Sequence, residues 1–180
     1  MAVEDYFIKL DGIDGESTDS KHSKEVEVLS FHFKGHQQGT AGSSTGGLGK
    51  GKVKLTDFVI SKRVDKSSPK LFLQCCNGEP VKKLVFTARK AGKDQQDYLK
   101  ITMTDCLVSE YNCGVEDDPT HHPRDPLSGL EKSHGPDWGP LEQVGFNYST
   151  IDFSYKEQKP DGTLGGEIKG GWSAIKNKQL

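Results

Sequence analysis

The sequence Ser68-Pro-Lys-Leu-Phe-Leu-Gln-Cys-Cys-Asn-Gly78 decides the fold, because it is the one stretch that clearly predicts a helix. Ser68 can cap the first turn, and Pro69 suits the first helical position. Gly78 can adopt the left-handed conformation that ends a helix. The side chains expected to face inward form two pairs at a spacing of four, Leu71 with Cys75 and Phe72 with Cys76.

The remaining apolar patterns predict strands. They cover residues 5–10, 25–33, 52–64, 83–89, 98–112, 144–155 and 166–175. The strand over 98–112 is the clearest, and the side chains expected on one face of it are Leu99, Ile101, Met103, Leu107 and Tyr111. One short helix among many strands favours a β-barrel or sandwich with the helix on its flank. It disfavours enzymes built on βαβ units.

Two of these strands change the phase of their alternation. Between residues 25 and 33, the apolar side chains move from even to odd positions after Val28. A β-bulge would produce this shift and bend the strand, and burial of the strand on both faces is the other explanation. Residues 144–155 make the same change after Tyr148, so we expect a second bulge there.

The chain of 180 residues fits a single domain spanning 1–180. Two segments inside it lack periodicity. Residues 35–51 hold seven glycines together with Ser, Thr and Gln, which predicts an extended loop. Residues 113–139 are rich in proline, histidine and acidic residues, which predicts an irregular insertion.

Composition and charge disfavour several classes of protein. The formal net charge of −2 gives no basic excess for binding nucleic acid. The first residues lack the basic and apolar regions of a signal peptide, and no apolar run is long enough to span a membrane. We therefore expect a protein that starts in the cytoplasm and has no stable membrane insertion. The four cysteines match neither a disulfide framework nor a zinc pattern.

No motif predicts catalysis. Residues 46–52 resemble a phosphate-binding loop, but Val53 stands where the magnesium-binding hydroxyl would be, and a strand follows instead of a helix. His121, His122 and His134 have residue types that bind zinc or nickel, although their spacing matches no closed site and a merely polar loop explains them as well. We therefore expect neither enzyme activity nor a cofactor.

Several uncommon strings occur along the chain in a fixed order. They are GIDGES over 12–17, VDKSSPKL over 64–71, RKAG over 89–92, YLKITM over 98–103, YKEQ over 155–158 and PDG over 160–162. In this order and spacing, the chain resembles the hemolysin-coregulated protein (Hcp) family of type VI secretion. The resemblance runs from the first strand to the C-terminus and lapses over about 113–139, where this chain is expected to carry an insertion.

The resemblance implies a fold and a role. It implies a mainly β protein, a small closed β-barrel formed by two sheets with one helix over about 68–78 on its side, that assembles into a hexameric ring. Rings would stack into the inner tube of the secretion apparatus and meet a contractile sheath and a VgrG-like spike. The tube would leave the bacterial cytoplasm for the outside or a target cell without a cleaved signal peptide. Small effector proteins would travel in its lumen.

The resemblance also suggests contact residues. Ser30 and His32 share a face of the second strand and are expected to line the lumen and contact cargo. Contacts within the ring or between rings are expected from loop residues Gly39, Thr40, Ser43, Ser44 and Leu48. In the insertion, docking to a partner is expected from His121, His122 and Trp138, and a tolerated surface loop is the alternative.

Two other functions stay open at this point. The first is a β-sandwich binding module that forms no rings. The second is a specialised secreted effector whose 113–139 insertion binds a partner, although about 27 irregular residues are too few for a catalytic domain.

Overall fold

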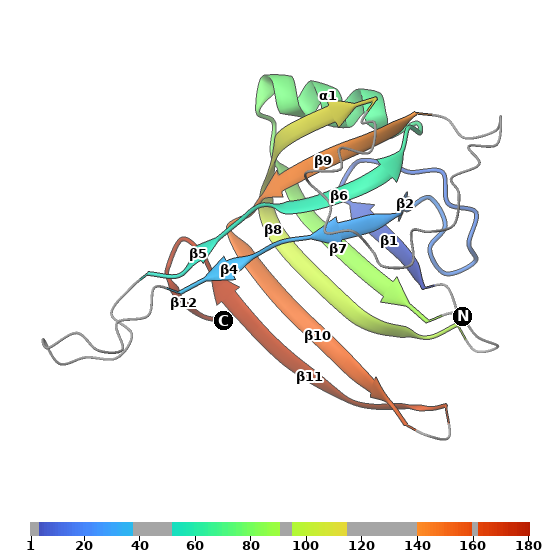
Figure 1. Ribbon diagram of the computed structural model, residues 1–180, viewed down its shortest axis with the longest axis vertical. Helices are drawn as coiled ribbons and strands as arrows, with labels where there is room; N and C mark the ends of the chain where they lie inside the picture. Colours follow the sequence, from blue (N-terminus) through green and yellow to red (C-terminus); the bar gives the residue numbers. More distant parts are fainter. Residues whose placement is uncertain (1–3, 38–51, 91–94, 115–139, 160–161) are drawn as a thin grey trace, which may run out of the picture.

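The computed structural model describes residues 4–37, 52–90, 95–114, 140–159 and 162–180. Within these ranges the chain forms one helix and a series of antiparallel strands (Figure 1). The strands are β1 (Asp5–Leu10), β2 (Val26–Val28), β3 (Ser30–His32), β4 (Gly35–His36), β5 (Lys54–Leu55), β6 (Phe58–Arg63), β7 (Val81–Arg89), β8 (Asp97–Cys113), β9 (Leu141–Asn147), β10 (Thr150–Gln158), β11 (Leu164–Ser173) and β12 (Lys178–Gln179), and the helix is α1 (Ser68–Asn77).

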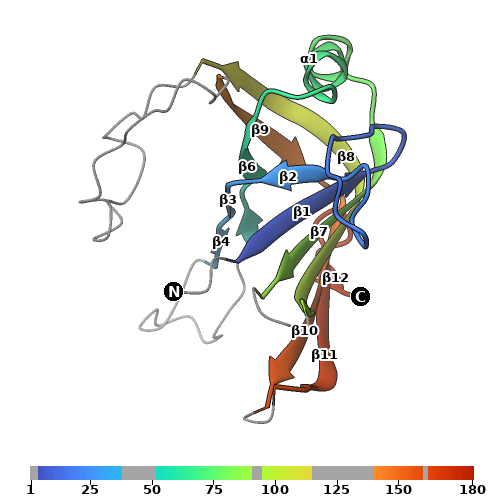
Figure 2. The same ribbon diagram turned by 90° about the vertical axis from the view of Figure 1, so that its right-hand side faces the viewer.

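Two sheets share the long strand β8. The first has the order β12-β11-β10-β8-β7-β1-β2, and the second pairs β3 with β6, β6 with β9, and β9 with β8. Strands β4 and β5 form a separate two-stranded pair. The first half of β8 therefore belongs to one sheet and its second half to the other, and Figure 2 shows the two sheets diverging from it.

Strand β8 bends where it passes between the sheets. Ile101 and Met103 are buried in its first half, whereas Cys106 and Val108 are buried in its second half. The change of phase falls at Asp105, whose φ of 50° is left-handed. The expected single alternation along 98–112 is therefore wrong after Met103, and Leu107 is 40% exposed.

The expected closed barrel is not what the strands form. The pairing is interrupted at Leu29, because β2 pairs only with β1 and β3 pairs only with β6. Between β2 and β3, the Leu29 N–H donates to the Ser61 carbonyl at 2.8 Å. The predicted phase change is real, because Leu29 is 46% exposed and turns the chain from one sheet to the other. Burial of this strand on both faces is therefore wrong.

The second predicted phase change has the same origin. Strand β9 ends at Asn147 in one sheet and β10 begins at Thr150 in the other, so the chain crosses between sheets there and no bulge is needed. Tyr148 lies at the crossing and is buried. Both changes of period thus mark exchanges between sheets.

The core lies between the two sheets. Aromatic rings fill its centre: Phe31 and Phe58 lie 4.3 Å and 5.5 Å from Phe86 between ring centroids. Apolar side chains surround these rings, and the fully buried ones include Ile8, Val26, Ile60, Leu71, Leu84, Ile101, Met103 and Val144. Each such side chain contributes roughly 1.5–3 kcal/mol relative to exposure.

Helix α1 spans the predicted residues, but Ser68 does not cap it: the N-cap position is Ser67, which makes no side-chain cap hydrogen bond, and Ser68 is already helical, with its Oγ bound to Glu142. The helix also buries a narrower face than expected. Gly78 follows it with a φ of 69°, and its N–H donates to the Gln74 carbonyl at 2.9 Å. Leu71 is fully buried, whereas Phe72 is 50% exposed and Cys76 is exposed. The expected inward direction of Phe72 and Cys76 is therefore wrong. The buried positions are Ser68, Leu71 and Gln74, because the helix touches mainly one strand, β8, and a spacing of three suits that narrow contact.

Candidate functional site

One sheet face opposite the core carries the two residues expected to meet cargo. Ser30 and His32 on β3 are directly opposite Ser61 and Val59 on β6, so the four side chains point the same way. Both Ser30 and His32 are exposed, and Phe31 between them points toward the core. We call this surface the polar face and extend it across β9 through the residues paired with Ser61 and Val59, which are Gln143 and Gly145.

Strand β8 has a bulge against β9 beside the polar face. The register shifts between Val108 and Glu110, opposite Gly145. A Cβ atom at Gly145 would lie 3.1 Å from the Cβ of Glu110 and 3.2 Å from the Oγ of Ser109. Glycine therefore allows β9 to pass close to the bulge. The face offers hydroxyl, imidazole and amide groups and holds no buried acid–base pair, so it suits binding better than catalysis.

A buried ion pair fixes the other side of this sheet to α1. Lys62 on β6 and Glu142 on β9 are directly opposite each other, both fully buried, and the Lys62 ammonium lies 2.5 Å from Glu142 Oε1. Ser68 Oγ on α1 donates to the same carboxylate oxygen at 2.8 Å, and Tyr111 Oη on β8 donates to Oε2 at 2.6 Å. We call these four residues the buried hub, since they join three strands and the helix.

The hub is fully satisfied by hydrogen bonds. The Lys62 ammonium also donates to Asp65 Oδ1 at 2.9 Å and to the Arg63 carbonyl at 2.8 Å. Burial and the neighbouring Glu142 carboxylate raise the pKa of the Tyr111 hydroxyl far above its usual value, so it stays a hydrogen-bond donor. Nothing in the sequence analysis anticipated the hub. The available signal was a lysine and a glutamate at positions in β6 and β9 where the alternation requires core residues.

A second polar cluster holds residues 11–25 against the first sheet. The buried Arg89 guanidinium donates to both carboxylate oxygens of Asp19, at 2.9 Å and 2.8 Å, and holds the pKa of that carboxyl well below its usual range. His22 stacks on Phe7 at 4.4 Å and contacts Glu25 at 2.9 Å through Nδ1. This segment covers the sheet face away from the core, and its role is structural.

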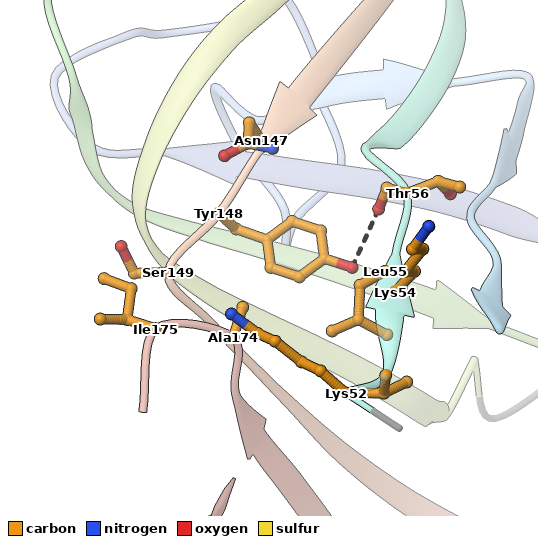
Figure 3. A pocket seen from close by; sticks show the side chains of 10 residues that line it. Lys52, Lys54, Leu55, Thr56, Asn147, Tyr148, Ser149, Ala174 and Ile175 are labelled. Atoms are coloured by element: carbon orange, nitrogen blue, oxygen red, sulfur yellow. Dashed lines mark hydrogen bonds between the residues drawn. The ribbon is translucent and has the colours of Figure 1, made fainter. Parts of the chain in front are cut away.

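An open groove lies between β5 and the β9–β10 crossing (Figure 3). It has a volume of about 740 Å³, and its lining includes Lys52, Lys54, Leu55 and Ile175. The Tyr148 ring points across it toward β5, and its hydroxyl donates to the Thr56 carbonyl at 3.1 Å. Burial raises the pKa of Tyr148 to about 12, so this phenol is not a general base near neutral pH.

All the other predicted contact residues, and the candidate metal ligands of the insertion, lie outside the described residues. These are the loop residues Gly39, Thr40, Ser43, Ser44 and Leu48 and the insertion residues His121, His122, His134 and Trp138. Within the described ranges, no group of three or more His, Cys, Asp or Glu side chains is placed to hold a metal ion. The same part of the chain has no helix long and apolar enough to cross a membrane.

Comparison with known proteins identifies the family. The profile of the family described as "Type VI secretion system effector, Hcp" matches residues 7–155. The chain belongs to the Hcp family. It is 34% identical to Protein hcp1 of Pseudomonas aeruginosa over 181 residues, which cover 99% of each chain.

Solved structures agree with this assignment to the Hcp family. A structure described as that of a type six secretion system protein has a TM-score of 0.83 at 31% identity, covering 99% of this chain and 100% of that one. Hcp1 from Salmonella typhimurium has a TM-score of 0.73 at 32% identity, with 100% of both chains covered. The resemblance drawn from the sequence strings is confirmed. Hcp proteins are secreted tube or effector proteins of type VI secretion systems and assemble into rings and tubes, so this chain is a structural protein and not an enzyme.

Proposed function

We propose that this Hcp protein forms hexameric rings that stack into the inner tube of a type VI secretion apparatus. The similarity to Protein hcp1 supports this, since the match covers 99% of each chain. In the tube, the protein would contact further rings of itself, a contractile sheath and a VgrG-like spike, and would pass from the bacterial cytoplasm to the outside or into a target cell.

The observation that carries this proposal is the polar face. A wall that faces a water-filled lumen needs polar side chains on the surface away from the core, as Ser30 and His32 provide. Such a wall can hold small effector proteins through hydrogen bonds without a large apolar patch. His32 would be the main cargo contact, because its imidazole is exposed and can both donate and accept hydrogen bonds.

Two segments would adapt this body to its neighbours. The loop over 35–51, with Gly39, Thr40, Ser43, Ser44 and Leu48, would contact adjacent copies in the ring or the stack. The insertion over 113–139, with His121, His122 and Trp138, would dock a partner on the ring surface. Gly114, where the insertion leaves β8, is joined to the start of β9, since its N–H donates to the Leu141 carbonyl at 2.9 Å.

Electron microscopy of a labelled variant tests the position of the polar face. The exposed cysteines, Cys76 and Cys113, would first be changed to serine. His32→Cys would then be labelled with maleimide-linked gold and imaged as negatively stained rings. Gold at the ring centre supports the proposal. Gold on the outer rim would overturn the lumen position, and discrete monomers would favour a binding module that forms no rings.

A further inference from the structure

The β4–β5 pair is a strongly basic projection. Lys34, His36, Lys52 and Lys54 are all exposed, and His36 lies directly opposite Lys54 in the pair. No acidic residue occurs in 34–37 or 52–55. We call these two ranges the basic stem. Figure 1 shows that it extends away from the body of the protein, at the left of the view.

A groove of opposite charge lies at the far end of the same strands. It has a volume of about 390 Å³, and the carboxylates of Glu16 and Glu27 line it together with the guanidinium of Arg63. Asp65 also lines it, but its carboxylate is paired with the buried Lys62 ammonium at 2.9 Å. Leu29 also lines it and is 46% exposed. We call this surface the acidic groove. With Asp65 paired with Lys62, the two carboxylates of Glu16 and Glu27 still outnumber the single guanidinium of Arg63, so the groove attracts cations.

The fold prevents the stem from reaching the groove of its own chain. Strand β5 in the stem leads directly into β6, which ends at Arg63 in the groove. Arg63 lies nine positions after Lys54, which corresponds to about 30 Å of extended chain. The two charged surfaces therefore point in opposite directions along the molecule, and their contact requires another copy.

We propose that the acidic groove of one copy binds the basic stem of a second copy, head to tail. The inference rests on the proposed assembly of the chain and names the surfaces that meet. A contact between two different patches is heterologous, so it repeats from copy to copy until it closes or continues as a tube. Charge complementarity selects the occupant: three lysines and no acid within 34–37 and 52–55 face Glu16 and Glu27, the groove carboxylates that Lys62 does not pair with. The apolar portions also match, since half-buried Val53 and Leu55 of the stem would cover exposed Leu29 and Val64.

Charge reversal on each side tests the contact. Lys54→Glu and Glu27→Lys would each oppose like charges, and the double variant would restore opposite charges in every contact. Each single variant should raise the concentration at half-dissociation of the assembly roughly fivefold or more. The double variant should bring this concentration most of the way back to the wild-type value. Sedimentation velocity and electron microscopy give the readout, and circular dichroism checks that each variant is folded. The matched control is Lys82→Glu, an exposed lysine on β7 outside both surfaces.

The outcomes separate this inference from the proposed function. Wild-type protein that remains monomeric at tens of micromolar, a range in which assemblies with micromolar dissociation constants form, overturns both. If the wild type assembles and the single variants assemble as well as Lys82→Glu, only the contact is overturned. The lysines then serve to keep the edges of the β4–β5 pair from pairing with other strands. The contact is also overturned if the double variant assembles more weakly than either single variant, by the sum of their two effects. Rescue by the double variant, together with weaker assembly at higher salt, supports it.

Discussion

Removing the Lys62 ammonium from the buried hub should strongly destabilise the fold. In Lys62→Met, the fully buried Glu142 carboxylate loses its partner at 2.5 Å, while Ser68 and Tyr111 still donate to it. Breaking a buried pair from one side typically costs about 3–5 kcal/mol, and the two remaining donors place this case near the lower end. The expected loss in the free energy of unfolding is therefore about 3 kcal/mol, a large share of the roughly 5–15 kcal/mol of a typical domain.

Urea unfolding followed by circular dichroism at one fixed protein concentration measures this loss. The double variant Lys62→Met with Glu142→Met removes both charges and should recover about 1–3 kcal/mol of the summed single losses. The matched control is Lys169→Met, whose ion pair with Glu167 is exposed and should change stability by less than about 1 kcal/mol. A Lys62→Met loss no larger than that of the control, or additive single losses, would show that the hub is not a coupled unit.

Three further predictions concern the body of the protein. Because Arg89 lowers the pKa of Asp19, their pair stabilises the fold above the unfolded-state pKa of about 4 and loses this effect as the pH falls. The unfolding free energy of wild type should therefore decrease more steeply below pH ~4.5 than that of Asp19→Asn, and parallel pH profiles would refute this. Gly15→Ala should lower the melting temperature markedly, because the new Cβ would collide with the Glu25 carbonyl oxygen; an unchanged melting temperature contradicts that contact. Phe58→Ala, at the centre of the aromatic core, should cost about 3–5 kcal/mol in urea unfolding, and a loss below about 1 kcal/mol would argue against this packing.

Local signals in the sequence predicted the helix and the places where the chain changes sheet. Pro69 and Gly78 act through their own backbone conformation, so the ends of α1 needed no knowledge of the rest of the chain. The phase changes after Val28 and Tyr148 were equally local. Each change marks an exchange between sheets and not a bulge in a closed barrel. This outcome depends on which strands pair, and an alternation with a period of two does not determine the pairing partners.

Side chains that depend on tertiary contacts were predicted less well. Phe72 belongs to an apolar stripe by spacing, yet it is half exposed because α1 packs mainly on one strand and meets Tyr111 only at its edge, at 5.6 Å between ring centroids. Lys62 and Glu142 are charged residues that a sequence assigns to the surface, and only their mutual position makes burial tolerable. Ser30 and His32 share one face of β3, as their spacing of two predicts, and both are exposed, while their contact with cargo stays a prediction. Their role came from the family strings and not from the pattern.

The native mass of the purified protein tests the central claim most directly. Native mass spectrometry at micromolar concentration, paired with negative-stain images of the same sample, reports how many copies assemble and in what shape. The account predicts a species of six times the 19.8 kDa chain mass that appears as rings with an open centre. A single species at the mass of one chain, with no rings in the images, would contradict it.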